Sequence, residues 1–259
     1  MKTLVCLLGQ VRHGEHTWEP FKKYVLDELH ADFILCGNVC VQNEFTVHAK
    51  HIFKTLGDPD PEYWKPFDHM PGTMGIGRSQ SYARQLVEIR RILFENIKDL
   101  GQWDQVIVSR SDLLWTGSHP KLDLDHIWCL NGEFHGGICD RHMVIPWRFL
   151  EGVLTMGIFE DISRTISFMN NYYNSIFHGN LPQGITNMEC FIFTRMVERG
   201  LIQHVGLTPF PMYLVDQSLG PKFLDEIDPD PQTLTWPFQI DHTFVSKNGM
   251  LQGRALKIV

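Results

Sequence analysis

The residues best suited to chemistry follow a short apolar run. Gln105-Val106-Ile107-Val108 has the composition of a buried strand, and Ser109-Arg110-Ser111-Asp112 comes directly after it. A carboxylate in that position lies at the carboxyl edge of a sheet and can hold Mg²⁺ or Mn²⁺, which prefer oxygen ligands, against two phosphates. Asp112 is therefore the candidate metal ligand, with Ser109 and Arg110 as nucleotide-binding neighbours. An aspartate that only caps a turn gives the same pattern.

Two further carboxylates are candidates for acid-base chemistry. Asp140 follows two glycines, which let a ligand approach the backbone closely, and Glu189 opens an expected helix. A carboxylate that faces an acceptor hydroxyl can remove its proton. We expect Asp140 to contact the transferred group, and either Glu189 or Asp140 to act as the base. A turn aspartate and a helix-start glutamate are the plain alternatives.

Two other segments contain residues that could bind a metal. His242, in Asp241-His242-Thr243, is a candidate late ligand, although a lone histidine is more often a surface or core residue. Asp123-Leu124-Asp125 has paired carboxylates, but no buried strand precedes it. We therefore interpret this second segment as a chance match, a decoy that does not bind the metal.

The elements expected around these residues alternate between strands and helices. Short apolar runs predict strands at 3–8, 31–36, 105–108 and 127–130, and helical spacing predicts helices at 17–29, 76–97 and 188–199, the last ending at Gly200. One or two helices are expected within 146–173, and a long loop over 43–75, where Asp-Pro-Asp-Pro occurs at 58–61. The pattern predicts an α/β fold with a mostly parallel central sheet flanked by helices.

The amino-acid composition limits the kinds of ligand and partner that the protein can bind. The formal net charge is −7 and the 23 Lys and Arg residues are dispersed, so nucleic acid is not expected as a partner, whereas a small phosphate ligand is compatible. The six cysteines lack paired spacing and are expected to be reduced. The first apolar run is too short to span a bilayer, so a soluble, cytoplasmic protein without a membrane span is expected.

The segment Trp-Asp-Gln-Val-Ile-Val-Ser-Arg-Ser-Asp-Leu-Leu-Trp at 103–115 resembles the hallmark segment of GT-A-fold glycosyltransferases. It is most similar to WavE-like polysaccharide-synthesis enzymes and to small glycosyltransferases of large algal viruses. The resemblance implies a GT-A-like, Rossmann-like fold. It departs from the usual Asp-x-Asp pattern because Arg110 stands at the first acidic position, which leaves one carboxylate for the metal.

Three more segments resemble the same family. For the turn Leu8-Gly9-Gln10-Val11-Arg12, the resemblance implies contacts with the base and ribose of the nucleotide. For the helix that carries Arg78 and Arg84, it implies contacts with the diphosphate. The segment at 136–142, which includes Asp140, resembles the donor-sugar and acceptor region. A late histidine such as His242 completes the metal shell in some members.

The function that the resemblance implies is metal-assisted sugar transfer from a nucleotide sugar to a hydroxyl of a glycan or glycoprotein. A UDP-sugar is favoured as donor, and the viral resemblance points to a pentose or deoxysugar such as xylose from UDP-xylose. One domain spans 1–259, with a nucleotide-binding part at about 1–118 and an acceptor-side part at about 119–259. For a viral enzyme the location would be the host cytoplasm.

A second class of enzyme shares part of the pattern. Arg12-His13-Gly14-Glu15 spells the signature of the histidine phosphatases, in which a histidine is phosphorylated and an arginine clamps the phosphoryl group. His135 could serve as the second histidine. The second phosphate-binding arginine is missing from Ser111-Asp112-Leu113-Leu114-Trp115, and the chain after His135 stays unexplained.

A third class is a glycan-binding protein without catalysis. Seven tryptophans are spread along the chain and would suit stacking on sugar faces. Most of these rings are expected in the core. Sugar binding without donor hydrolysis would distinguish this class.

Overall fold

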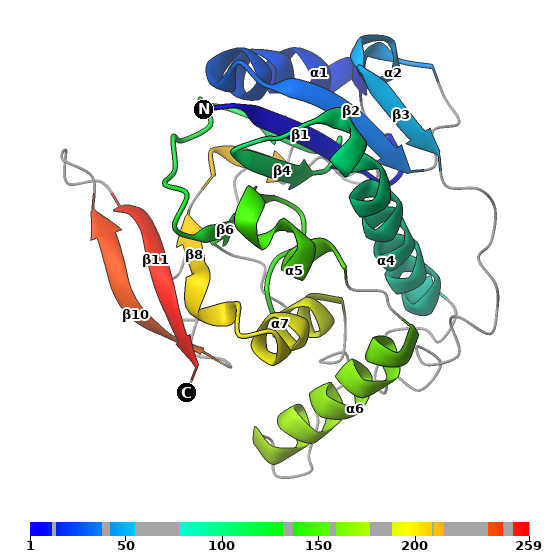
Figure 1. Cartoon of the computed structure of the whole chain (residues 1–259). Coiled ribbons are helices and arrows are strands. Elements are labelled where there is room, and N and C mark those ends of the chain that lie inside the picture. Colours follow the sequence, from blue (N-terminus) through cyan, green and yellow to red (C-terminus); the bar gives the residue numbers. More distant parts are fainter. Residues whose placement is uncertain are drawn as a thin grey trace.

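A computed structural model shows a central sheet with helices on both faces (Figure 1). It describes residues 1–11, 14–37, 42–54, 78–131, 137–155, 159–176, 188–208, 210–214, 238–245 and 251–258. For some of these ranges, among them 78–87, 238–245 and 251–258, it describes the backbone and not the side chains.

Nine of the described strands form one sheet in the order β10-β11-β8-β6-β7-β4-β1-β2-β3, and β5 pairs with β9 separately. Among them, β7 and β11 run against the others. The predicted mostly parallel sheet is thereby confirmed. The strands are β1 Thr3–Leu8, β2 Asp32–Gly37, β3 His51–Lys54, β4 Gln105–Ser109, β5 Leu113–Trp115, β6 Ile127–Leu130, β7 Met143–Pro146, β8 Val205–Thr208, β9 Met212–Leu214, β10 Phe238–Val245 and β11 Leu251–Ile258.

The helices fill the connections between these strands. They are α1 Gly14–Phe21, α2 Glu44–His48, α4 Arg78–Ile97, α5 Leu150–Leu154, α6 Phe159–Ile176 and α7 Met188–Glu198, with a π-helical segment η1 at Lys22–Asp27 and short 3₁₀ turns η3 Lys98–Leu100, η4 Trp147–Phe149 and η5 Ile202–His204. Helix α7 ends as predicted, because the N–H groups of Gly200 and Leu201 donate to the carbonyls of Val197 and Met196.

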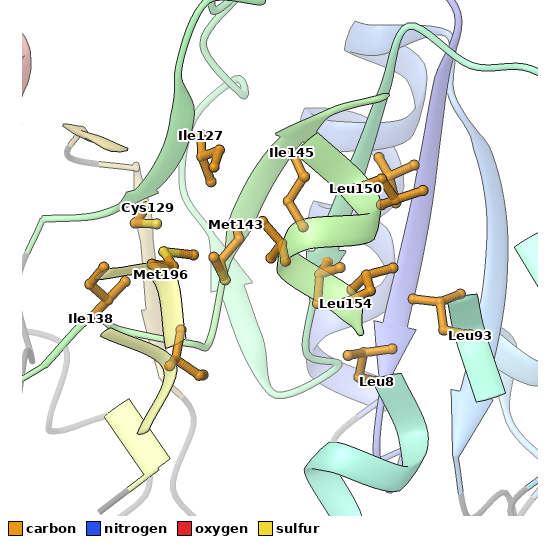
Figure 2. Packing of buried hydrophobic residues seen from close by; sticks show 14 of the residues in the cluster. Leu8, Leu93, Ile127, Cys129, Ile138, Met143, Ile145, Leu150, Leu154 and Met196 are labelled. Atoms are coloured by element: carbon orange, nitrogen blue, oxygen red, sulfur yellow. The ribbon is translucent and has the colours of Figure 1, made fainter. Parts of the chain in front are cut away.

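Alternate residues of each central strand face opposite layers of core. Leu4, Cys6 and Leu8 pack with α4, α5 and α7, whereas Val5 and Leu7 pack with α1. Figure 2 shows the first layer, where Met143 and Ile145 of β7 meet Leu150 and Leu154 of α5. This two-sided burial explains why the central strands are apolar without alternation.

Several element predictions are confirmed and one needs correction. The strands at 3–8 and 127–130 and the helix ending at Ile97 are found where they were expected. The region 43–75 is not loop throughout, because α2 and β3 lie within it. Residues 143–146 form strand β7, which was not predicted. The Asp-Pro-Asp-Pro segments lie outside the described residues.

The cysteines and tryptophans behave as the composition predicts. Within the described part of the chain five cysteines are buried and form no disulfide: Cys6, Cys36, Cys129, Cys139 and Cys190. The rings of Trp18, Trp103, Trp115 and Trp128 are buried. Across the described residues no helix is both long and apolar enough to span a membrane.

Candidate functional site

The chain changes direction across the sheet between β1 and β4. It proceeds from β1 to β2 and β3 on one side and then returns to β4 on the other side of β1. Open parallel sheets bind ligands beyond the carboxyl ends of the strands at such a switch point. Strand β1 ends at Leu8 and β4 at Ser109, so the two predicted motifs meet at this edge.

The turn after β1 is packed against the ends of its neighbours. Gly9 has a φ of +94°, and its N–H donates to the Cys36 carbonyl over 3.0 Å. A Cβ at Gly37 would lie 2.3 Å from the Gly9 carbonyl oxygen, so the two backbones approach as only glycine allows. The Gln10 carbonyl accepts a hydrogen bond from Ser111 Oγ over 3.4 Å, which joins this turn to the β4 motif. Arg12 lies outside the described residues.

Arg110 and Asp112 form a bidentate ion pair within the motif. Arg110 Nε donates to Asp112 Oδ1 over 3.0 Å and Arg110 Nη2 donates to Oδ2 over 2.6 Å. The Arg110 side chain is 26% exposed and that of Asp112 8%. Thr17 Oγ1 on α1 donates to the Ser111 carbonyl over 2.7 Å, which fixes the turn between them. Arginine and carboxylate in this geometry make a strong, oriented contact.

The donor set around Asp112 does not fit a divalent metal ion. Both Asp112 oxygens already accept hydrogen bonds from the guanidinium. At about 4 Å that guanidinium would repel a cation by about 4 kcal/mol per unit charge, for an effective dielectric constant near 20. Among the described residues no group of three His, Cys, Asp or Glu side chains gathers as a metal site.

His242, the other predicted metal ligand, is not brought to Asp112. It lies on β10, which stands five places from β4 in the strand order. At about 4.8 Å per strand, the separation is roughly 24 Å, far beyond the reach of two ligands on one ion. A metal shared by Asp112 and His242 therefore has no support in the described residues.

A buried chain of polar side chains lies beneath the motif. His142 Nδ1 lies 2.9 Å from Ser109 Oγ, and His142 Nε2 lies 3.2 Å from His119 Nε2. His119 Nδ1 lies 2.8 Å from the Pro120 carbonyl oxygen. Since that carbonyl only accepts, His119 must be protonated at Nδ1, and His142 at Nε2. The Ser109 hydroxyl therefore donates to His142, and every hydrogen bond in the chain has one direction.

Both histidines are held neutral. Burial lowers the pKa of His119 to about 4. Burial, together with the adjacent His119, lowers the pKa of His142 well below its ordinary value. A neutral pair keeps the orientation of the Ser109 hydroxyl fixed near neutral pH.

Asp140 lies at the same edge, just before the reversed strand β7. Its carboxylate is 4% exposed, and Oδ2 lies 3.8 Å from Nη2 of the buried Arg90 on α4. The Nη1 of Arg90 makes no hydrogen bond within the described part of the chain. Sequence reasoning did not select Arg90, although its spacing from Leu93 and Ile97 puts a charge within the apolar stripe of α4. His119 and His142 were also missed, and their isolated positions carry no spacing signal.

Glu189 is held next to the Asp140 segment. Its carbonyl accepts a hydrogen bond from the Ile138 N–H over 3.1 Å at the start of α7. A Cβ at Gly137 would lie 2.0 Å from the same carbonyl oxygen. The absence of a side chain at Gly137 thus lets the two segments touch. The two predicted catalytic carboxylates lie on adjoining segments, and Glu189 is the more exposed of them.

The N-terminus of α4 points to this edge as well. The helix leads into β4 at the amino edge, so its first residue, Arg78, lies toward the carboxyl edge. Arg84 follows six residues later, about 9 Å along the axis. The side chains of both arginines lie outside the described residues. The backbone N–H groups of a helix start favour anions.

The opposite edge contains the decoy and a cavity. Asp123 accepts hydrogen bonds from the backbone N–H groups of Asp125 and His126 just before β6, so its carboxylate is used within a turn. A cavity of about 320 Å³ is lined by Trp18, Lys22, His30, Asp32, His48 and Lys50, among others, near the start of β2. None of the predicted site residues in the described ranges lines this cavity.

Comparison with known proteins adds no family assignment. Neither a protein-family model nor a curated protein matches this chain.

Proposed function

We propose that the chain is a glycosyltransferase of GT-A-like fold that binds a nucleotide sugar at the carboxyl edge of its sheet. The observation that supports this most directly is the meeting of two predicted motifs at the switch point, where Ser111 Oγ contacts the Gln10 carbonyl. A UDP-sugar is the favoured donor, with UDP-xylose as the specific candidate. The acceptor would be a hydroxyl of a glycan or glycoprotein.

In this proposal the two parts of the chain have separate tasks. Residues 1–118 hold the nucleotide through Gly9, Gln10, Arg12 and the α4 arginines Arg78 and Arg84, with Ser109 and Arg110 at the diphosphate. Residues 119–259 face the acceptor. In an inverting transfer, the acceptor oxygen bonds to C1 of the sugar while the bond from C1 to the diphosphate oxygen breaks with its electron pair. The hydroxyl proton passes to Glu189.

Asp140 would contact the donor sugar rather than remove the proton. Its low exposure and its contact with Arg90 favour a carboxylate that is held in a fixed position and accepts hydrogen bonds from sugar hydroxyls. Glu189 is better placed as a base because it is less buried and opens a helix that faces the same edge.

The proposal is tested first by nucleotide binding and then by sugar transfer. UDP, GDP, CMP and their sugars are screened by thermal shift, each with EDTA or Mn²⁺. At one hundred times its dissociation constant, a ligand of the folded state adds about 2.7 kcal/mol, which for a chain of this size raises the melting temperature by about 5–10 °C. Glu189→Gln should keep that shift and lose transfer detected by mass spectrometry.

The same screen tests the alternatives. Stabilisation by inorganic phosphate or a phosphoglycerate, with none by nucleotides, would favour the phosphatase hypothesis, whose Arg12, His13 and His135 lie outside the described residues. Stabilisation by glycans alone, without donor hydrolysis, would favour a binding protein. A Glu189→Gln variant with full transfer would remove Glu189 as the base.

A further inference from the structure

We propose that Arg110 takes the place of the divalent cation at the donor diphosphate, and that Asp112 is its positioning residue rather than a metal ligand. This inference rests on the proposed function and specifies how the donor is held. It replaces the metal-assisted reading of the Ser109 to Asp112 motif.

The first support is the geometry of the pair. Asp112 contacts Nε and Nη2 of Arg110 at 3.0 and 2.6 Å, so both its oxygens hold one edge of the guanidinium. A guanidinium carries five N–H groups in a fixed plane, and its fork matches phosphate oxygens as well as carboxylates. Holding one edge orients the whole plane.

The second support is the order of exposure. Arg110 is 26% exposed and Asp112 8%, so the cation is the outer partner of the pair and the carboxylate the inner one. A metal ligand would need the reverse order, with the carboxylate facing the diphosphate. The turn is also anchored from behind, because Thr17 Oγ1 bonds the Ser111 carbonyl.

The third support is the charge that the reaction develops. When the bond from C1 to the diphosphate breaks, its electron pair stays on the β-phosphate oxygen, and a cation beside that oxygen stabilises the leaving group. A fixed guanidinium supplies one positive charge there. The N-terminus of α4 lies toward the same edge and adds the positive end of a helix dipole.

The experiment measures UDP affinity by calorimetry with EDTA and with Mn²⁺. The wild type should bind equally in both. Arg110→Ala should bind at least about tenfold more weakly in both, as expected for loss of a charge-assisted phosphate contact. Arg110→Lys, which keeps the charge without the fork, should fall between them. Asp112→Asn, which keeps an acceptor oxygen beside Arg110, should retain most of the affinity.

The matched control is Arg148→Ala. Arg148 forms an exposed pair with Asp125 over 3.0 Å, away from the motif, and its loss should leave UDP affinity unchanged. Thermal unfolding of each variant separates lost binding from lost folding.

Two results would overturn the inference while keeping the proposed function. In one, wild-type binding requires Mn²⁺ and Asp112→Asn abolishes it, which would make Asp112 a metal ligand. In the other, Arg110→Ala binds UDP as tightly as the wild type in EDTA. If the wild type binds none of UDP, GDP and CMP under either condition, the proposed function itself is wrong and this inference with it.

Discussion

At the scale of single residues, the site combines an ion pair with a buried pair of neutral histidines. Arg110 and Asp112 form the ion pair, whereas burial keeps His119 and His142 neutral in a directed chain to Ser109. Sequence patterns located Ser109 and Asp112 because they follow an apolar strand. The partners of these residues come from distant segments, so their pairing depends on the fold.

The buried histidines predict a pH-dependent stability. The folded-state pKa of His119 is about 4, below the ordinary value of 6.5, so the unfolded chain binds more protons between these values. Stability from this group is therefore present above pH 6.5 and is lost as the pH falls toward 4, by up to about 3 kcal/mol. His142 shifts in the same direction and adds to the loss. Urea unfolding at pH 7.5, 6, 5 and 4 measures it.

His119→Gln provides the check on this prediction. The amide oxygen of the glutamine can still accept a hydrogen bond from His142 Nε2, but the amide does not titrate. Over the same pH range the free energy of unfolding of the variant should therefore fall by about 3 kcal/mol less than that of the wild type. His16→Gln, at an exposed position, is the control and should behave as the wild type. Equal losses in His119→Gln and the wild type would show that His119 is not held neutral by the fold.

At the scale of elements, strands β1, β2, β4 and β6 were predictable from their apolar runs and the other described strands were not. Strand β7, Met143–Pro146, leads directly into Trp147–Phe149 and α5, and such a run has no periodicity that separates a strand from a helix start. Strand β3 was missed because it lies at the sheet edge. Helix α2 had a usable signal, since Asn43 and Thr46 form its capping box.

The contact of the Asp140 segment with α7 leaves no room for a single added methyl group. In Gly137→Ala the new Cβ would meet the Glu189 carbonyl oxygen at 2.0 Å and the Cys190 nitrogen at 2.4 Å. These are backbone atoms, so the segment must move away from α7, at a cost of about 2–3 kcal/mol. Chemical denaturation measures this loss, and under the proposed function sugar transfer should fall further than nucleotide binding.

Gly14→Ala is the matched control for that substitution. A Cβ at Gly14 would have its nearest neighbours at 3.4 Å, in ordinary contact with Asn43 and Phe45, at the start of α1. Its stability should stay near that of the wild type. If Gly137→Ala is equally harmless, the close approach of the two segments is not required for folding.

At the scale of the whole molecule, the segments before and after residue 118 share one sheet and one core. Strand β4 pairs along its length with β7, from Gln105 with Pro146 to Val108 with Met143. The layer shown in Figure 2 likewise joins Leu8 and Leu93 to Ile127, Met143 and Met196. The boundary near residue 118 therefore does not separate two cores, and under the proposed function it would divide two tasks within one folding unit.

This shared core predicts how fragments behave. A chain ending at residue 118 would expose the edge of β4 and the apolar residues Val106 and Val108, which otherwise pack with Met143 and Ile145. It should show no cooperative thermal transition, because a core that lacks most of one layer cannot offset the entropy of folding. Adding the separate 119–259 fragment should restore a transition if the halves associate. A sharp, reversible transition in the 1–118 fragment alone would instead show that this fragment folds independently.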